Sequence, residues 1–279
     1  MKLSIVTVNY NNAEGLRQTI ESVLNQSFTD FEYLVIDGAS TDGSTDIIRQ
    51  YADKISYWVS EPDKGIYQAM NKGIRKAQGE YLQFLNSGDV FYDSNVLTQT
   101  FSRSYPEDML TGSIVREYPN GKKVMEKGWA YVREKQGRQM TLFDFFVGYL
   151  PHQATFIRKK VFEQYGLYDE QNRIVSDRLF FMKTIGLNNV SIRYLDIVMV
   201  CFDMGGISNT DPKGRIRENE AAEERLIPAS LLMDYRYFQK VNQDIHKALK
   251  YKFTFRLCRF INRLVTVYEI ILGKNTQLD

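Results

Sequence analysis

Hydrophobic residues in the first 90 positions alternate between short continuous runs and helically spaced positions. Residues 3–8 form an apolar, largely β-branched run, as in a strand buried on both faces, and Leu16, Ile20 and Val23 then recur on one helix face. The predicted strands are residues 3–8, 32–36, 57–59 and 81–85, and the predicted helices are residues 13–26, 44–51 and 67–77. This order predicts an α/β fold with a largely parallel, doubly wound sheet.

Beyond residue 89 the alternation loosens. Residues 118–122 read as a hairpin turn, and residues 128–150 form an aromatic, glycine-interrupted stretch that could act as a mobile lid. The other predicted strands are residues 114–117, 123–126, 153–158 and 190–202. One predicted helix starts at residue 160, and three more cover residues 215–226, 229–249 and 251–272. We place a boundary near Pro212, which predicts domains at residues 1–210 and 211–279.

Composition describes an ordinary soluble globular protein. The 279 residues are 43% hydrophobic and 25% charged, with a formal net charge of +2, so the molecule as a whole is no polyanion binder. Cys201 and Cys258 form no CxxC pair, which favours reduced thiols in a reducing compartment. No signal peptide and no apolar run of membrane-spanning length is evident, so a cytoplasmic location is expected.

Acidic and amide side chains follow the predicted strands where each strand ends. Asn9 and Tyr10 follow the first strand, Asp37 ends the second, Asp63 lies in the loop after the third, and Asp89 closes the segment after the fourth. The carboxyl ends of parallel strands share one sheet edge, where open α/β sheets bind ligands. A carboxylate next to a diphosphate requires a divalent cation between them, and Asp89 suits Mn²⁺ or Mg²⁺.

Four ordered segments now carry a family resemblance. SIVTVNYN, VIDGASTDGSTDII, EPDKGIYQAMNKGI and GEYLQFLNSGD resemble the inverting glycosyltransferases of family 2, which have the GT-A nucleotide-diphospho-sugar transferase fold. The resemblance is dense over residues 1–90, looser to 208, and nearest to the bacterial branch that builds exopolysaccharide, colanic-acid-like or O-antigen units. It implies a Rossmann-like GT-A domain with a C-terminal helical extension.

The resemblance also implies roles for residues at the strand ends. Asp37 matches the carboxylate that accepts from the base ring, usually uracil. The other residues implied to surround the nucleotide are Thr7, Asn9, Tyr10, Asp63, Lys64, Gly65 and Asn71. Asn86, Ser87, Gly88 and Asp89 stand where the family keeps its metal motif. Because Asn86 and Gly88 replace acidic residues, Asp89 is the one predicted metal ligand, and metal should bind weakly without the donor diphosphate.

A second cluster supplies the predicted base. Residues 151–156 and 174–177 match segments where related enzymes keep a catalytic Asp, which here is Asp177; an ion pair with Arg173 or Arg178 is the alternative. His152 is expected to contact the acceptor or a phosphate, or to be a hydrogen-bonded core residue. Asp203 is expected on the acceptor side, ahead of two glycines at 205 and 206 that allow close approach or form a turn.

The C-terminal segment carries a basic stripe. Lys252, Arg256, Arg259 and Arg263 recur at helical spacing, and residues 247–279 hold seven Lys/Arg against two Asp/Glu. Residues 247–272 could therefore lie on an anionic membrane surface, at the inner face of the plasma membrane, or pack on the catalytic domain with the cations in water. Nucleic acid is not an expected partner, because no recognised motif accompanies the stripe.

The resemblance, together with the residues at the strand ends, implies a metal-dependent inverting glycosyltransferase. The expected donor is a UDP-sugar, and the expected acceptor is a saccharide, free or linked to polyprenyl diphosphate, in cell-surface polysaccharide synthesis. A nucleotidyltransferase on the same fold would carry a glycine-rich phosphate loop after the first strand, which NYNNAEG does not provide. A catalytically silent nucleotide-sugar-binding subunit stays open because of Asn86 and Gly88.

Overall fold

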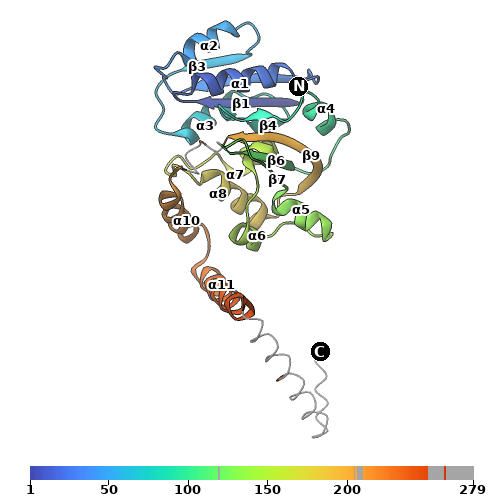
Figure 1. The fold of residues 1–279 in the computed structure, drawn as a ribbon, viewed down its shortest axis with the longest axis vertical. Coiled ribbons are helices and arrows are strands. Elements are labelled where there is room, and N and C mark those ends of the chain that lie inside the picture. Colours follow the sequence, from blue (N-terminus) through green and yellow to red (C-terminus); the bar gives the residue numbers. More distant parts are fainter. Residues whose placement is uncertain (119, 204, 206–209, 251–260, 262–279) are drawn as a thin grey trace. The chain divides into compact units, whose positions relative to one another are not determined.

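The computed structural model describes residues 1–118, 120–203, 205, 210–250 and 261 (Figure 1). For residues 242–250 it describes the backbone alone. Two compact units divide the chain, Met1–Leu226 and Ile227–Asp279. The predicted boundary at residue 210 therefore falls within the first unit, which also contains helix α10. Whether residues 1–210 form an independent domain stays a prediction.

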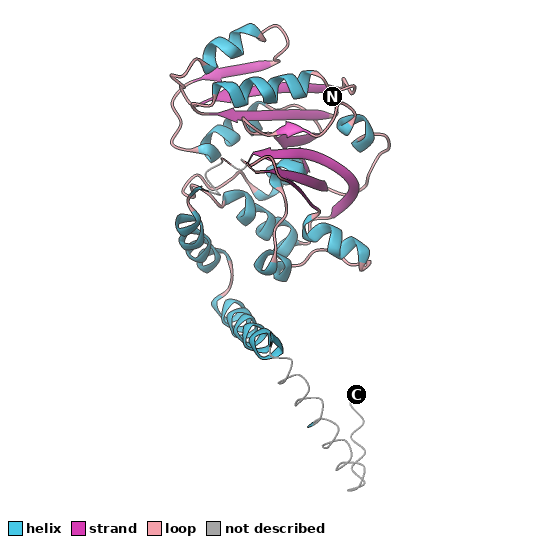
Figure 2. Cartoon of the chain, in the orientation of Figure 1, coloured by secondary structure: helices cyan, strands magenta, loops and turns pink. Residues whose placement is uncertain are grey.

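The first four strands form a parallel half-sheet. Their order is β3-β2-β1-β4, and each neighbouring pair is parallel (Figure 2). The elements are β1 (Leu3–Asn9), α1 (Ala13–Leu24), β2 (Phe31–Asp37), α2 (Ser44–Gln50), β3 (Tyr57–Ser60), α3 (Ile66–Lys76) and β4 (Tyr81–Phe84). Each predicted strand and helix of this half is confirmed, with ends shifted by at most two residues.

The rest of the sheet is mixed. The complete order is β3-β2-β1-β4-β8-β6-β9-β5, with β7 pairing off this path with β6. Strand β8 is antiparallel to both β4 and β6, and β5 is antiparallel to β9, whereas β6 and β9 are parallel. The prediction of a largely parallel sheet is therefore wrong beyond β4. The order arises from pairings between distant segments, such as Tyr81 with Arg158, which local periodicity does not specify.

The second half contains more elements than the sequence predicted. They are β5 (Val90–Phe91), α4 (Val96–Thr100), β6 (Met109–Glu117), β7 (Lys123–Glu126), α5 (Gly128–Lys135), α6 (Leu142–Val147), η1 (His152–Ala154), β8 (Thr155–Arg158), α7 (Lys159–Tyr165), α8 (Ser176–Phe181), the π-helix η2 (Met182–Leu187), β9 (Ile192–Asp203) and α10 (Pro212–Leu226). The predicted hairpin is confirmed, with Ile114 opposite Glu126 and Glu117 opposite Lys123.

Residues 128–150 fold into two helices. Thr141 and Asp144 form a capping box at the start of α6, and the fully buried Asp144 carboxylate also accepts from Arg133 Nε of α5 at 2.7 Å. Such a cap satisfies backbone donors that would otherwise lack partners at the helix start. The two helices are thus tied to each other. Closure of this segment over a donor stays a prediction.

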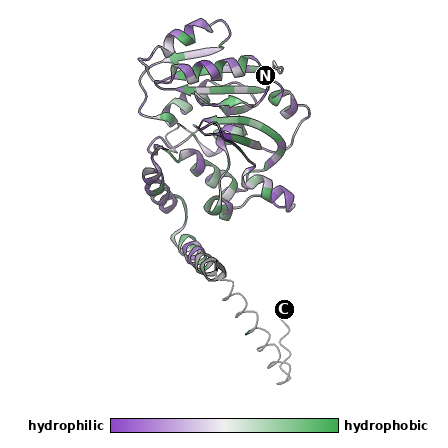
Figure 3. Cartoon of the chain, in the orientation of Figure 1, coloured by the Kyte–Doolittle hydropathy of each residue, from purple (hydrophilic) through white to green (hydrophobic). Residues whose placement is uncertain are grey.

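The core lies on both faces of the half-sheet. Strands β1, β2 and β4 are buried over almost their whole length, hydrophobic residues recur along them (Figure 3), and Leu3, Ile5 and Val6 have no exposed surface. Helix α3 approaches β1 so closely that a Cβ on Gly73 would lie 2.4 Å from Val6 Cγ1. Burial on both faces explains why these strands are continuous apolar runs rather than alternating ones.

The second unit begins with helix α11 (Ala229–Lys250), which confirms the helix predicted at residues 229–249. Several of its large apolar side chains are exposed, among them Leu231, Met233, Tyr237 and Phe238. The predicted helix 251–272 and its basic stripe lie outside the described residues, except Ile261, which is helical. Within the part of the chain that is described, no helix has the length and apolarity to span a membrane.

Candidate functional site

The ends of the first strands meet at one sheet edge. Asn9 pairs in register with Asp37, and Asp37 with Ser60, so the last residues of β1, β2 and β3 are neighbours. Beyond β4, the Ser87 amide still donates to the Val8 carbonyl, which brings the Asn86–Asp89 segment to the end of β1. The edge predicted from the sequence is therefore present, with β1 at its centre.

Asp37 is fully buried, and donors of the chain fill its acceptor positions. Oδ1 accepts from Asn9 Nδ2 at 2.7 Å and from Ser40 Oγ at 2.6 Å, whereas Oδ2 accepts from the Ser40 amide at 3.0 Å and from Ser60 Oγ at 2.6 Å. A carboxylate offers about four acceptor sites. A bond from Asp37 to a nucleobase therefore requires one serine hydroxyl to rotate away.

Thr7 and Tyr10 occupy opposite environments. Thr7 is fully buried, donates to the Leu85 carbonyl at 2.7 Å and accepts from the Tyr33 hydroxyl at 3.0 Å, so its contacts belong to the sheet core. Tyr10 is 70% exposed, and a Cβ on Gly38 would lie 3.2 Å from its ring. Of the two, Tyr10 has the free ring face that contact with a base requires.

Asp63 lies next to Asp37 and binds Lys72 of α3. Its Oδ1 is 2.6 Å from Lys72 Nζ, which also contacts Glu61 at 2.8 Å. Burial raises the pKa of Asp63 above its usual value despite the ammonium group, and the charges of Glu61 and Asp37 act in the same direction. This carboxylate is therefore poorly solvated, and a ligand hydroxyl would supply a missing donor.

The other residues predicted around the nucleotide divide into two groups. Lys64 and Gly65 are exposed, and Gly65 has a φ of +154° that favours glycine. Asn71 is buried and faces the second half of the fold. It donates to the Tyr168 carbonyl at 2.9 Å and to Glu170 at 2.8 Å, and accepts from the Tyr168 amide at 3.0 Å. Its contacts join α3 to the loop before α8.

Asp89 lies close to Asp203 at the end of β9. The Asp203 amide donates to Asp89 Oδ1 at 3.0 Å, and a Cβ on Gly88, whose φ is +102°, would lie 2.8 Å from Asp203 Oδ2. Burial raises the pKa of Asp89 to about 8, and the Asp203 charge adds to the shift. Sequence spacing did not predict this pairing. Met204 and residues 206–209, including the second glycine, lie outside the described residues.

The pair fits a divalent cation. Two adjacent carboxylates repel each other unless a cation or a proton lies between them, and the nearby Asn86 Oδ1 is a buried acceptor with no hydrogen-bond partner in the described structure. Oxygen donors of this kind are those that Mg²⁺ and Mn²⁺ prefer. The described residues contain no group of three or more His, Cys, Asp or Glu suited to a metal.

Asp177 lies in the first turn of α8, where Tyr67 of α3 reaches it. The Tyr67 hydroxyl is 2.8 Å from Asp177 Oδ1 and 2.7 Å from the Ile174 carbonyl oxygen. Burial raises the pKa of Tyr67 well above its usual value, with the Asp177 charge contributing, so the phenol stays a donor. Sequence reasoning quoted the segment that contains Tyr67 without assigning this residue a role.

The ion pairs considered for Asp177 are formed by other acids. Arg178 contacts Glu223 at 2.7 Å and Arg173 contacts Asp211 at 3.8 Å. Both acids belong to α10 or the residue before it. Among the described residues, Asp177 thus has a phenol donor and no ion-pair partner, an arrangement that leaves it available to accept a proton.

His152 is a core residue. Its Nε2 is 2.9 Å from the Tyr168 hydroxyl, and its ring stacks on Phe84 with centroids 5.1 Å apart. Burial lowers the pKa of His152, which keeps the ring neutral, although the Asp177 charge opposes the shift. This environment is that of a hydrogen-bonded core residue, the second of the two expectations for His152. Its contact with an acceptor or a phosphate stays a prediction.

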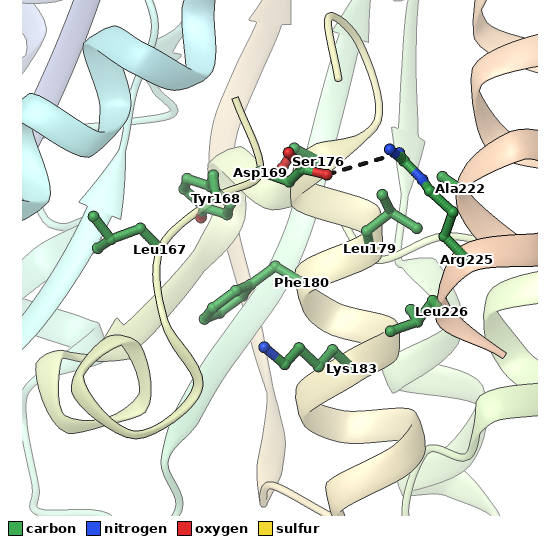
Figure 4. Close-up of a pocket in the computed structure, with 10 residues that line it drawn as sticks. All are labelled: Leu167, Tyr168, Asp169, Ser176, Leu179, Phe180, Lys183, Ala222, Arg225 and Leu226. Carbon is green, nitrogen blue, oxygen red and sulfur yellow. Dashed lines mark ion pairs between the residues drawn. The ribbon is translucent and has the colours of Figure 1, made fainter. Parts of the chain in front are cut away.

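A cavity of about 240 Å³ lies between α8, the loop before it and α10 (Figure 4). Ser176, Leu179 and Phe180 line one side, and Arg225 pairs with Asp169 at 3.7 Å across another. The strand-end residues do not line it. The cavity therefore belongs to the contact between α8 and α10.

Comparison with known proteins identifies the family. Residues 4–166 match the family described as glycosyl transferase family 2. The chain belongs to glycosyltransferase family 2. It is an enzyme of the transferase class, and the family, GT-A fold and enzyme class predicted from the sequence are confirmed. The matched region ends before Asp177.

Relatives and solved structures agree with this family. The chain is 28% identical over 214 residues to a PGL/p-HBAD biosynthesis glycosyltransferase of Mycobacterium tuberculosis, covering 74% of this chain and 79% of the relative. It is 38% identical over 90 residues to the putative teichuronic acid biosynthesis glycosyltransferase TuaG of Bacillus subtilis, covering 31% and 36%. These names assign the two relatives to PGL/p-HBAD and teichuronic acid biosynthesis, and neither name mentions the colanic acid or O-antigen expected from the sequence.

The structural neighbours share the fold. Residues 1–349 of S. aureus TarS, solved with UDP, align with a TM-score of 0.61 at 22% identity, covering 84% of this chain and 69% of TarS. The alignment with the structure of the same TarS fragment without UDP covers 64% of that fragment, so this chain spans slightly less than two thirds of its length. A Pyrobaculum calidifontis mannosyltransferase with GDP-Man and Mn²⁺ aligns with a TM-score of 0.61 at 15% identity, covering 81% and 64%.

Proposed function

We propose that this family 2 glycosyltransferase is an inverting, metal-dependent enzyme that uses a UDP-sugar. The acceptor would be a saccharide, free or carried on polyprenyl diphosphate, in cell-surface polysaccharide synthesis. The observation that carries the proposal is the bond between Tyr67 and Asp177. Helix α3 begins directly after Asp63–Gly65, so this bond connects the proposed nucleotide loop to the proposed base.

The strand ends would hold the nucleoside. Tyr10 offers an exposed ring, Asp63 a poorly solvated carboxylate, and Asn9 Oδ1 is a buried acceptor without a partner in the described structure. A ribose or nucleobase carries donors that match these acceptors. The TarS structures with UDP and UDP-GlcNAc support uridine by analogy of fold.

Asp177 would act as the general base. Tyr67 donates to Oδ1, and Oδ2 has no donor among the residues that the structure describes. Oδ2 would take the proton of the acceptor hydroxyl while that oxygen bonds to the anomeric carbon and the bond to the nucleoside diphosphate breaks. One displacement inverts the anomeric centre, so no covalent nucleophile on the protein is needed.

Asp89, Asp203 and the Asn86 amide oxygen would hold the cation. When bound, Mn²⁺ or Mg²⁺ stabilises the negative charge of the leaving diphosphate. Asp203 supplies a second carboxylate where Asn86 and Gly88 lack one, which weakens the case for a catalytically silent subunit. Location at the inner face of the plasma membrane, through the second unit, remains part of this proposal.

Calorimetric titration tests the proposal. UDP, GDP, CDP and dTDP are titrated into wild type, Asp89→Ala and the exposed control Asp53→Ala, each with and without Mn²⁺. We expect UDP to bind tightly when Mn²⁺ is present, Asp89→Ala to lose that enhancement, and Asp53→Ala to retain it. Tighter binding of another nucleotide would overturn the uridine assignment, and equal UDP affinity with and without Mn²⁺ would overturn the metal site.

A further inference from the structure

A single side chain of α10 binds the backbone of residues 173–175, just before Asp177. The Glu218 carboxylate accepts from three consecutive backbone amides, those of Arg173, Ile174 and Val175; Oε2 is 2.6 Å from the Ile174 nitrogen and 3.0 Å from the Val175 nitrogen. Successive backbone N–H groups form a concave site for an anion. Here the anion is part of the same chain.

Ile174 is fixed at both ends of its backbone. Its amide donates to Glu218, and its carbonyl oxygen lies 2.7 Å from the Tyr67 hydroxyl, whose single proton is shared with Asp177 Oδ1. Glu218 and Tyr67 therefore constrain the same residue from α10 and α3. The position of the Asp177 carboxylate depends on this residue, because only Val175 and Ser176 separate them.

Arg178 ties the other side of Asp177 to the same helix. Its guanidinium donates to Asn219 at 3.0 Å, to Glu223 at 2.7 Å and to the Phe145 carbonyl at 2.7 Å. Ala222 of α10 packs in a small apolar cluster with Ile174 and Val175. Residues on both sides of Asp177 are thus bound to α10, whereas Asp177 itself contacts α3.

We propose that Glu218 is a positioning residue for Asp177: it fixes the backbone of residues 173–175 and thereby the base. This inference rests on the proposed role of Asp177. It assigns α10 to the catalytic machinery, although the helix lies beyond the matched family region and was predicted to belong to the C-terminal extension. Removing this carboxylate should impair the chemical step and leave the nucleotide site intact.

The experiment compares Glu218→Gln and Glu218→Ala in the full-length protein with Glu220→Gln, an exposed acid on the same helix. Glutamine keeps the shape but presents an NH₂ group to backbone donors. Turnover is measured as UDP release from a panel of UDP-sugars with Mn²⁺, with water as acceptor. Hydrogen exchange of residues 171–181 and the thermal midpoint are measured in parallel, together with Asp177→Asn and the Asp177→Asn/Glu218→Gln double variant.

We expect both Glu218 variants to lose about 10- to 100-fold in kcat with little change in the donor KM, since small displacements of a catalytic group have effects of that size. Amides 173–175 should exchange faster, and Glu220→Gln should match wild type. In the Asp177→Asn background, Glu218→Gln should have no further effect on kcat, because the two residues act in one step.

Other outcomes separate this inference from the proposed function. Normal kcat in Glu218→Gln with a lowered thermal midpoint would show that Glu218 serves stability alone, and an additive loss in the double variant would show that it acts independently of Asp177. Either result overturns the positioning role. Normal turnover in Asp177→Asn would instead overturn the base assignment, on which the inference depends.

Discussion

The two halves of the first unit build their parts of the site differently. In residues 1–89, strands in parallel order deliver Asn9, Asp37 and the Asn86–Asp89 segment to one edge, and each residue is placed by the strand before it. In residues 90–226, Asp177 is placed by Tyr67, 110 positions earlier, and by Glu218, which holds the preceding backbone. One half is specified locally and the other by contacts between distant segments.

This difference explains which functions each half suits. Parallel strands with short loops make a stiff edge that can bind a nucleotide whatever the rest of the chain does. A base held by separate helices can be shifted when either helix moves. Donor binding should therefore tolerate changes in the second half that leave Asp203 intact, and catalysis should not.

The largest expected effect is that of Asp177→Asn. If the second half supplies the base, the rate of sugar transfer or UDP-sugar hydrolysis should fall by about 10²- to 10⁴-fold, the usual contribution of a general base. The donor KM should change little. Steady-state kinetics and UDP titration check this, and an active Asp177→Asn variant would locate the base elsewhere.

The next effect concerns Asp89 and pH. Burial raises the pKa of folded Asp89 to about 8, so between pH 4 and 8 the folded protein retains a proton that the unfolded chain loses. Without metal, the free energy of unfolding should therefore fall as pH rises through this range. Asp89→Asn should remove that contribution and be more stable than wild type at pH 8 by up to about 5 kcal/mol, because each pH unit between the two pKa values contributes about 1.4 kcal/mol.

Chemical denaturation at pH 5 and pH 8 in EDTA measures this difference. Added Mn²⁺ should stabilise wild type at pH 8 and leave Asp89→Asn unchanged. A flat pH dependence in wild type would mean that Asp89 is better solvated than its 3% exposure indicates.

Tyr67→Phe should have an intermediate effect on turnover. Removing the phenol takes away a hydrogen bond to a carboxylate, worth about 1.5–3 kcal/mol, so a loss of roughly tenfold or more in kcat is expected. Nucleotide affinity should stay the same. Tyr92→Phe, which changes an exposed tyrosine, is the matched control. A loss confined to donor KM would place Tyr67 in the nucleotide site instead.

The smallest effect is expected from Tyr10→Ala. The ring is exposed, so stability should not change, and UDP affinity should weaken about fivefold or more because stacking on a base is worth about 1–3 kcal/mol. Calorimetry and thermal denaturation measure the two quantities. Unaltered UDP affinity would remove Tyr10 from the site and leave the edge to polar contacts.

The fold was predictable where sequence neighbours are also spatial neighbours. The four parallel strands, their helices and the 114–126 hairpin all follow from local patterns. The insertion of β8 between β4 and β6 does not, because antiparallel and parallel neighbours of a buried strand look alike in sequence. Short helices such as α8, whose six residues give less than two turns, are also too brief for periodicity to identify.

The candidate site was predictable to the same extent. Asp37 and Asp89 follow strands, so their positions could be predicted. The pairing of Asp203 with Asp89 depends on β9 running beside β5, a contact between segments more than 100 residues apart. Asn71 was expected at the nucleotide, but its amide is bound to residues 168–170, and only the folded chain shows which face of α3 it occupies.

Helix α10 limits how parts of this enzyme can be exchanged with those of a relative. A chimera joined at residue 210, the boundary predicted from the sequence, would take Glu218 from one parent and the backbone of residues 173–175, which it binds, from the other. A joint after Leu226 keeps these partners together. Turnover should therefore transfer between relatives only when residues 1–226 move as one piece.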